Sequence, residues 1–292
     1  MDVSIVLVSY NTKDLTKDCL NSIYRFTEGI EFEVFVVDNN SHDGSAQMIE
    51  QEFQQVRLIR NSDNKGFGAA NNIAIRESNA KYIFCLNTDT VLLNNSIKEF
   101  YDFMEKEENK NIGACGCQLL DKNMKLQHSY GYFPNIQKIV ASNLFLARIF
   151  PTWYKKHFTY SPNENSKNPY QVEYITGADL FIRKSVLDKI GFFDENFFMY
   201  FEESELQHRM LKNNFISVII PTINIIHLCG LPSKNPSVEK LKMYRESELY
   251  YFEKIGGKKV RQFVKILYII RFIFNIKFDK SYIDKLKMHI NI

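Results

Sequence analysis

The sequence has 292 residues, of which 45% are hydrophobic and 24% are charged. This balance excludes disorder as the main state of the chain, and the length fits one α/β domain with an appendage. The formal net charge of +3 is too small to indicate nucleic-acid binding. The basic excess lies at one end, because residues 258–292 contain nine Lys or Arg and two Asp.

The cysteines and the first residues favour a cytoplasmic protein. The cysteine count is odd and no Cys-X-X-Cys occurs, so we expect reduced core thiols at Cys19, Cys85, Cys115, Cys117 and Cys229. The chain starts in a strand-like run without a basic leader, so we expect no secretory signal. No segment reaches the roughly 18 consecutive apolar residues that a membrane-spanning helix needs.

Apolar runs alternate with helical patterns over the first 120 residues. The runs expected to form buried parallel strands are 3–9, 32–37, 56–59, 81–86 and 112–119. Helices are expected between them, most clearly at 67–77 and 95–106, with Asn11-Thr12 and the polar segment 38–44 as caps of the first two. This order predicts an α/β fold with a Rossmann-like, mostly parallel sheet and helices on both faces.

The alternation weakens after residue 120. Residues 130–170 are rich in Tyr, Phe, Asn and Pro, and we expect an insertion or flexible loop with an amphipathic stretch at 136–150. Regular structure is expected again as a glycine-interrupted strand at 174–183, a helix at 185–190, a turn at 191–195, a helix at 204–212 and a strand at 215–220.

Polar residues follow each of the first four strands, where ligands bind in parallel sheets. The four segments are 9–11, 38–41, 64–68 and 87–89. The alternative is that these loops are polar only because they are solvated. The first segment lacks the glycines of a dinucleotide-binding turn and no P-loop motif occurs, so NAD and P-loop chemistry are disfavoured.

Acidic residues and one histidine could carry chemistry. Asp38 ends a strand, where its carboxylate could accept hydrogen bonds from a base or ribose. Asp89 could bind a divalent cation, the alternative being a helix cap. Glu202 and Glu203 follow an aromatic run that would raise a carboxylate pKa towards that of a general base, although acids also stabilise helix N-termini. His227 is a ligand candidate only if a cation lies nearby, and otherwise a core residue.

These residues together resemble the inverting glycosyltransferases of family 2, which have the GT-A fold, and most of all the bacterial rhamnosyltransferase-like subgroup. The resemblance covers about residues 2–230, and its segments in order are 8–11, 37–45, 64–72, 86–90, 176–179, 191–195 and 198–206, followed by His227. It implies a GT-A domain at 1–230, divided into a nucleotide-sugar half at 1–120 and an acceptor and catalytic half at 121–230, with a helical extension at 231–292.

The resemblance assigns roles by position. It implies a donor site of Ser9, Tyr10, Asn11, Asp38, Asn40, Lys65, Gly66, Asn71, Asn87 and Thr88. It implies acceptor contacts at Gly177, Ala178 and Asp179, and a Mg²⁺ or Mn²⁺ ion held by Asp89 and His227. It also implies that the acidic pair supplies the catalytic base, Glu203. The family pair is usually Glu-Asp, so the longer side chain displaces the carboxylate by about one bond length, and Glu202 is the alternative base.

The implied reaction is transfer of a sugar, with inversion, from a dTDP- or UDP-sugar to a glycan or lipid-linked saccharide in cell-surface polysaccharide synthesis. The resemblance to the rhamnosyltransferase-like subgroup implies dTDP-L-rhamnose as the donor. The rivals are a sugar nucleotidyltransferase, whose Gly-rich basic loop after the first strand is missing, and a degenerate, non-catalytic nucleotide-sugar or glycan-binding protein.

The C-terminal segment 258–287 alternates basic with apolar residues. A helical stripe of Val260, Phe263, Val264, Leu267 and Phe274 is expected, which suits peripheral contact with anionic lipid on the inner face of the cell membrane. The alternative is a helix packed on the catalytic domain with its lysines solvated.

Overall fold

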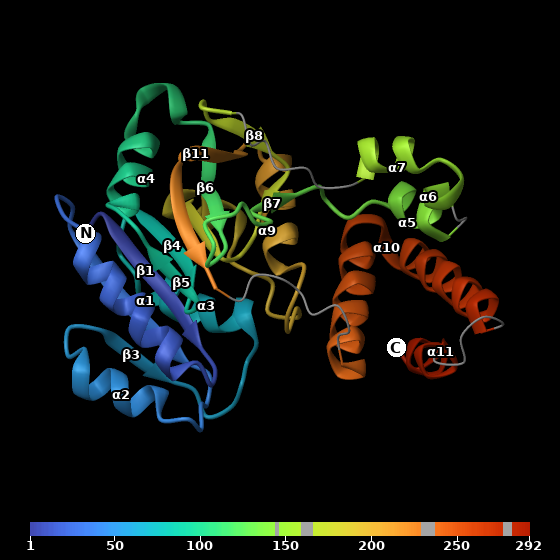
Figure 1. Ribbon diagram of the computed structural model, residues 1–292, viewed down its shortest axis with the longest axis horizontal. Helices are drawn as coiled ribbons and strands as arrows, with labels where there is room; N and C mark the ends of the chain where they lie inside the picture. Colours follow the sequence, from blue (N-terminus) through green and yellow to red (C-terminus); the bar gives the residue numbers. More distant parts are fainter. Residues whose placement is uncertain (144–145, 159–165, 229–236, 277–281) are drawn as a thin grey trace. The chain divides into compact units, whose positions relative to one another are not determined.

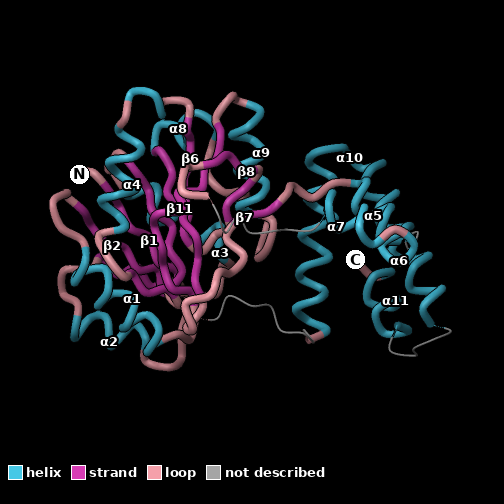
Figure 2. The backbone as a smooth tube through the Cα atoms, turned by 45° about the horizontal axis from the view of Figure 1, so that its top comes forward, coloured by secondary structure: helices cyan, strands magenta, loops and turns pink. Residues whose placement is uncertain are grey.

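The computed structural model describes residues 1–143, 146–158, 166–228, 237–276 and 282–292 (Figure 1). Within them the chain forms two compact units. Unit 1 comprises residues 1–131, 162–196 and 202–231, and unit 2 comprises 132–161, 197–201 and 232–292. All the described strands belong to unit 1, whereas the regular structure described in unit 2 is helical (Figure 2).

A nine-stranded sheet forms the centre of unit 1, in the order β3-β2-β1-β4-β10-β6-β11-β5, with β8 paired to β11. Its strands are β1 (Val3–Ser9), β2 (Phe32–Asp38), β3 (Arg57–Arg60), β4 (Tyr82–Asn87), β5 (Thr90–Leu92), β6 (Ile112–Leu120), β8 (Tyr170–Val172), β10 (Asp179–Arg183) and β11 (Ile216–His227). Among these, only β5, β8 and β10 run against the others, so the expected mostly parallel sheet is confirmed. A separate two-stranded sheet pairs β7 (Tyr130–Gly131) with β9 (Tyr174–Ile175).

Helices cover both faces of this sheet, as expected. On one face lie α1 (Lys13–Phe26), α2 (Ser45–Glu52) and α4 (Ser96–Glu105), and on the other α3 (Phe67–Glu77), α8 (Lys184–Ile190) and α9 (Glu202–Lys212). A short 3₁₀ helix spans Glu107–Asn109. Side chains alternate along each strand, so Leu7 packs in the first core and Val6 in the second. Burying one such side chain contributes about 1.5–3 kcal/mol, and the two cores therefore fix the strand register.

The predicted cap of the first helix is wrong in its detail. Thr12 occupies the N-cap position but makes no side-chain capping bond. Instead, the Lys13 backbone N–H donates to Asp43 Oδ2 over 2.9 Å, and Asp43 Oδ1 accepts the Ser45 N–H at the start of α2. One carboxylate from the loop after β2 thus satisfies the first turns of two helices.

Strand β11 continues beyond the predicted 215–220 and ends at His227. Its register against β6 shifts between Ile220 and Asn224, around Pro221, which has no N–H to donate. Beyond this irregularity β11 pairs with β5, and His227 lies opposite Thr90. The extension carries His227 to the strand that follows Asp89.

Unit 2 contains α5 (Ile136–Asn143), α6 (Leu146–Ile149), α7 (Pro151–Phe158), α10 (Val238–Ile276) and α11 (Tyr282–Ile290). The flexible loop that was one of the two expectations for 130–170 is wrong, because the described part of that region holds three short helices, of which α5 and α6 lie in the stretch expected at 136–150. Apolar side chains from α5, α10 and the segment 197–201 form a core that includes Ile139, Phe197 and Phe252. Gly257 breaks α10 with a positive φ of 79°, a conformation that glycine adopts without strain.

The second half of α10 does not present the stripe that the sequence predicted. Val264 is fully buried in the core of unit 2, and Val260 and Leu267 pack against that core, whereas Phe263 and Phe274 are exposed. The apolar residues of this helix therefore fall on two faces. None of the described helices offers an apolar stretch long enough to cross a bilayer.

The predicted division at residue 230 lies outside the described residues and stays a prediction. The two compact units divide the chain differently from this prediction, because residues 132–161 and 197–201 group with the C-terminal helices. Four of the five cysteines, Cys19, Cys85, Cys115 and Cys117, are buried free thiols, and Cys229 also lies outside the described residues.

Candidate functional site

Three strands of the sheet end side by side and bring their polar residues together. In the parallel register Ser9 of β1 lies opposite Asp38 of β2, and Val8 lies opposite Asn87 of β4. The segments after β1 and β2 are joined by hydrogen bonds from the Asn11 N–H to Ser41 Oγ and from the His42 N–H to Asn11 Oδ1. The structure thus brings the predicted polar segments to one edge of the sheet.

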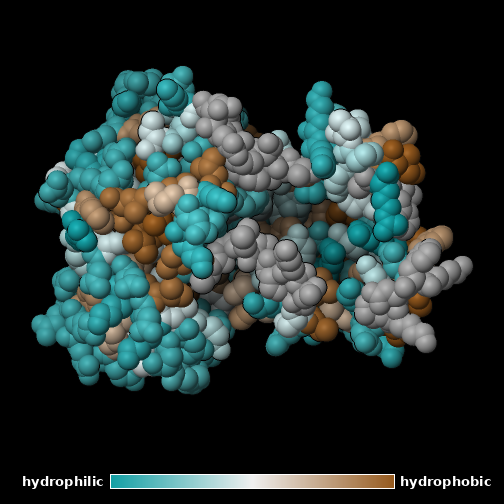
Figure 3. Space-filling model, viewed as in Figure 1, coloured by the Kyte–Doolittle hydropathy of each residue, from teal (hydrophilic) through white to brown (hydrophobic). Residues whose placement is uncertain are grey.

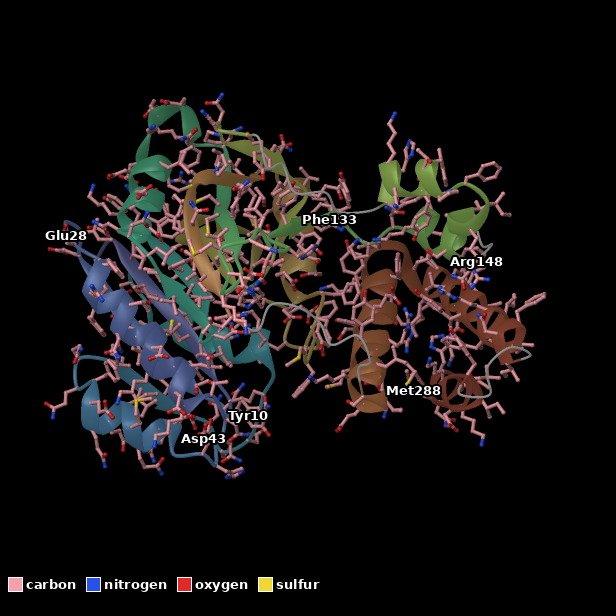
Figure 4. All side chains as sticks on the ribbon, in the orientation of Figure 1. Tyr10, Glu28, Asp43, Phe133, Arg148 and Met288 are labelled. Carbon is pink, nitrogen blue, oxygen red and sulfur yellow. The ribbon has the colours of Figure 1, made fainter. Side chains whose placement is uncertain are left out.

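Asp38 is the buried acid of this edge. One oxygen accepts the Ser41 N–H over 3.0 Å, and the other, Oδ1, is buried without a hydrogen-bond partner among the described residues. A buried carboxylate oxygen without a donor is costly, and a hydroxyl or N–H of a ligand would remove that cost. Tyr10, next to Ser9, is 48% exposed and lies near Asp43 at this edge (Figure 4). Its ring is free to contact a ligand.

The backbone at this edge is held in unusual conformations. Asn11 and Asn40 have positive φ values of 55° and 65°, which asparagine tolerates better than most residues. Ser9 is fully buried and its hydroxyl bonds with Thr12 and Thr16, so it supports the turn from within. Of these predicted donor contacts, Tyr10 and Asn11 are exposed, whereas Ser9 is enclosed.

Asn39 fastens the loop after β3 over the strand ends, a role that the sequence reasoning missed. Its buried amide donates to Asn64 Oδ1 and to the Gly66 carbonyl, and its oxygen accepts from Asn61. The sequence did mark this position, because Asn39 lies in the predicted polar segment 38–41, between the predicted donor contacts Asp38 and Asn40. Lys65 itself points to solvent and forms an ion pair with Asp63 at 3.0 Å.

Helix α3 begins at this loop and presents two buried amides. Gly66 precedes it with a φ of 82°. The Asn71 amide donates to the Phe67 carbonyl, and Asn71 Oδ1 is buried without a hydrogen-bond partner among the described residues. Asn72 is another residue that was missed. Its side-chain amide donates to the Phe193 carbonyl and its Oδ1 accepts the Phe193 N–H, so Asn72 anchors the turn before α9.

The predicted metal ligands meet in space although they are far apart in the sequence. His227 Nε2 lies 3.3 Å from Asp89 Oδ1, and the Leu228 N–H donates to the Asp89 carbonyl over 2.8 Å. Thr88 Oγ1 donates to Thr12 Oγ1, and the Thr90 hydroxyl donates to the Asn87 carbonyl, so both neighbours of Asp89 are fixed. Pairing of β5 with β11 therefore sets the position of both groups.

One carboxylate and one imidazole in contact suit a divalent cation with an open coordination sphere. Their side chains are 17% and 12% exposed, so solvent or a ligand can reach them. No cluster of three or more His, Cys, Asp or Glu side chains suited to a metal occurs among the described residues. The protein would supply two ligands, leaving other positions to water and phosphate oxygens, as Mg²⁺ commonly has.

Glu202 and Glu203 form the first turn of α9. Burial raises the pKa of Glu202 well above its usual range, and the neighbouring charge of Glu203 raises it further. Burial also raises the pKa of Glu203, to about 7. Glu202 Oε2 has no hydrogen-bond partner among the described residues. Two adjacent carboxyl groups whose pKa values are raised towards neutrality are suited to general acid-base chemistry.

A strained segment of unit 2 leads directly into these carboxylates. Tyr200 and Phe201 have φ values of 72° and 69°, which cost about 1–3 kcal/mol each for residues with bulky side chains. The Phe201 ring packs on Tyr244 at a centroid distance of 4.9 Å, and Ser247 Oγ donates to the Met199 carbonyl over 2.7 Å. These contacts hold residues 199–201 against α10 within unit 2.

Two of the three predicted acceptor residues, Ala178 and Asp179, are buried. Ala178 is buried in the first core, and its carbonyl accepts the Asn87 N–H. Gly177 lies against the Phe67 ring, where an added Cβ would be 3.1 Å away. Asp179 is fully buried: Oδ2 accepts the Cys117 N–H over 2.6 Å, and Oδ1 has no hydrogen-bond partner among the described residues.

Burial raises the pKa of Asp179 to about 7, although the Cys117 N–H opposes this shift. Because the folded-state pKa lies above the unfolded value near 4, the stability that the neutral carboxyl provides is present at low pH and lost as the pH rises through about 7. We expect Asp179→Asn to raise the melting temperature more at pH 8.5 than at pH 5. The full effect corresponds to about 4 kcal/mol in the free energy of unfolding.

The control is Asp121→Asn, because backbone N–H groups lower the pKa of Asp121 and its ionised form is the stabilising one. The melting temperature of Asp121→Asn should not rise above that of the wild type at pH 8.5. Calorimetry at pH 5 and pH 8.5 measures the melting temperatures of both variants. An equal gain for Asp179→Asn at pH 5 and pH 8.5 would contradict the assignment of a costly buried charge.

The family model described as "Glycosyl transferase family 2" matches residues 4–191 of this chain. The chain belongs to that family. Among curated relatives of this family 2 chain is the N-acetylglucosaminyl-diphospho-decaprenol L-rhamnosyltransferase of Mycobacterium tuberculosis, 25% identical over 236 residues, which are 76% of this chain and 75% of the relative. The dTDP-rhamnosyl transferase RfbF of Shigella flexneri is 25% identical over 234 residues, 78% and 70% of the two chains.

A solved structure resembles the whole family 2 chain. The mannosyltransferase PcManGT of Pyrobaculum calidifontis, in complex with GDP-Man and Mn²⁺, aligns with a TM-score of 0.59 over 98% of this chain and 83% of its own. The two sequences are 12% identical, so the likeness concerns the fold alone. It confirms the expected GT-A fold of this glycosyltransferase.

Proposed function

We propose that this family 2 enzyme transfers L-rhamnose from dTDP-rhamnose, with inversion, to a hydroxyl of a lipid-linked saccharide. The observation that carries the proposal is the Asp89–His227 contact of 3.3 Å at the carboxyl edge of the sheet, an edge that also holds the unsatisfied buried oxygen of Asp38 at the end of β2. The printed names of the two rhamnosyltransferase relatives support the sugar and the lipid-linked acceptor.

The donor would lie along the edge formed by β1, β2 and β4. Asp38 Oδ1 would accept a hydrogen bond from the nucleoside, and the exposed Tyr10 ring would contact the base. Asn40, Asn87 and Thr88 belong to the same edge, and the loop with Lys65, Gly66 and Asn71 would cover the donor. Pre-formed hydrogen bonds around Asn39 and Asn11 lower the entropy cost of binding.

Asp89 and His227 would hold Mg²⁺ or Mn²⁺ through an oxygen and a neutral nitrogen. When bound, such a cation neutralises the negative charge that develops on a departing diphosphate. Asp89 keeps its orientation through the contact with His227 and the backbone bond to Leu228.

Glu203 would take the proton from the acceptor hydroxyl. The acceptor oxygen then bonds to the anomeric carbon as the bond from that carbon to the diphosphate breaks on the opposite face, and the configuration inverts. Burial raises the pKa of Glu203 to about 7, and a general base is most effective when its pKa lies near the working pH. The acceptor would approach near Gly177, Ala178 and Asp179, and the buried Ala178 would contribute through its backbone.

A donor screen tests this function. The full chain is incubated with Mn²⁺ and a panel of dTDP-, UDP- and GDP-sugars, with melting temperature and nucleotide release in the presence of a lipid-linked saccharide as the two readouts. We expect dTDP-rhamnose to raise the melting temperature most, because a ligand stabilises the state that binds it, and to release dTDP. Stabilisation without release by any donor would identify a binding protein and contradict the proposal.

Because the proposed acceptor is lipid-linked, we also propose that the enzyme associates peripherally with the inner face of the cell membrane through residues 258–292. The basic excess of that segment and the decaprenol in the name of one relative support this location.

A further inference from the structure

The second half of α10 exposes an apolar face that its own unit leaves uncovered. Val264, Tyr268 and Phe272 point into the core of unit 2 at intervals of four residues. Five other apolar side chains are each 46–57% exposed: Phe263, Ile266, Ile270, Ile273 and Phe274. Their spacing of three and four residues places them on one side of the helix, and we call them the α10 stripe.

A continuous row of half-exposed Ile and Phe residues needs a partner. Single apolar residues are common on protein surfaces, whereas contiguous apolar patches mark sites of association. Figure 3 shows brown, apolar atoms at several places on the surface of the unit that carries α10 and α11.

The charge around the α10 stripe has one sign. Residues 258–276 contain Lys258, Lys259, Arg261, Lys265 and Arg271 and no acidic residue. Arg261 pairs with Glu253, and Lys265 donates to the Ile290 carbonyl, so part of this charge is engaged within unit 2. Of the others, Lys258 and Lys259 precede the stripe and Arg271 lies within its span.

These charges distinguish a second copy of the chain from a lipid surface as the occupant of the α10 stripe. A second copy meeting this face symmetrically would bring the same basic groups opposite one another, which opposes association. An anionic lipid surface would instead accept the apolar side chains at the boundary of its acyl chains and the basic groups among its headgroups.

We infer that the α10 stripe is a docking face for an anionic bilayer surface, with the second half of α10 lying in the plane of the interface. The inference rests on the proposed function for its purpose, since docking would bring the enzyme to a lipid-linked acceptor. It deepens that function by naming the side chains that make the contact, which differ from the stripe read from the sequence.

The test is sedimentation of the full chain with vesicles of phosphatidylglycerol and phosphatidylcholine in equal amounts, or of phosphatidylcholine alone. The stripe variant carries Ile266→Ser, Ile270→Ser and Phe274→Ser. The matched control carries Met124→Ser, Leu211→Ser and Val238→Ser, which are also exposed apolar residues but lie outside the stripe. Melting temperature and circular dichroism establish that all three proteins are folded.

We expect the wild-type chain and the control to bind the anionic vesicles, and the stripe variant to bind at least tenfold more weakly. Wild-type binding should weaken in 0.5 M salt and on neutral vesicles. Equal binding by stripe variant and control would overturn the inference. So would a wild-type dimer in light scattering that the stripe variant converts to monomer without any vesicle binding.

The stripe and the proposed reaction can fail separately. If the stripe variant loses vesicle binding while no nucleotide-sugar is turned over, the docking face stands and the reaction fails. If dTDP-rhamnose is turned over while stripe variant and control bind vesicles equally, the reaction stands and the docking face fails.

Discussion

Glu203→Gln is expected to lower the rate of sugar transfer by about 10²–10⁴-fold, the range that a general base contributes. Glutamine keeps the size of the side chain but cannot accept the acceptor's proton. Donor affinity should stay within about threefold, because the proposed donor contacts lie on β1, β2 and β4 and in the loop before α3. Steady-state kinetics for transfer and calorimetric titration with dTDP measure the two quantities.

Glu202→Gln is the matched control, since it removes the neighbouring and more deeply buried carboxyl group. In the wild type, kcat/KM should rise with pH through about 7, because burial raises the pKa of Glu203 to that value and the base acts when ionised. This rise should disappear in Glu203→Gln. If Glu202→Gln is inactive and Glu203→Gln is active, then Glu202 is the base and the assignment of Glu203 is wrong.

Asp89→Ala is expected to abolish the stabilisation of the protein by Mn²⁺ with dTDP and to lower transfer at least a hundredfold. The change removes one of the two groups, 3.3 Å apart, that we propose as ligands, and His227 alone would hold the cation weakly. His227→Ala should have the same effect to a lesser degree. Melting temperatures with and without Mn²⁺, dTDP and EDTA provide the measurement.

Asp188→Asn serves as the control for Asp89→Ala, because it removes an exposed carboxylate that is paired with Lys184 and lies far in the sequence from both proposed metal ligands. It should respond to Mn²⁺ and dTDP as the wild type does. A normal response by Asp89→Ala would remove that residue from the proposed metal site.

The sheet of unit 1 could be predicted because its central strands, such as β1 and β4, are buried on both faces. Runs such as residues 3–9 and 81–86 are almost continuously apolar, which is typical of parallel strands covered on both faces. The polar residues after each strand then had to lie at one edge, and the register of Ser9 with Asp38 places them there. Here local composition determines both the element and its position.

The details that failed depend on contacts between distant segments. Asp43 caps α1 from the loop after β2, across thirty residues, and no local pattern at Thr12 reveals this. Likewise, Val264 and Phe263 are adjacent and both apolar, and only the packing of α10 in unit 2 decides which is buried. The meeting of Asp89 with His227 was expected from the family resemblance, whereas pairing of β5 with β11 is its physical cause.

The most direct test of the account is a crystal structure of the full chain with Mn²⁺ and dTDP, with anomalous scattering recorded at the manganese edge. The account predicts one manganese peak coordinated by the Asp89 carboxylate, His227 Nε2 and the diphosphate, with the Glu203 carboxylate facing the ion across a space the size of one hexose. A peak bound elsewhere, or a Glu203 side chain directed away from that space, would contradict it.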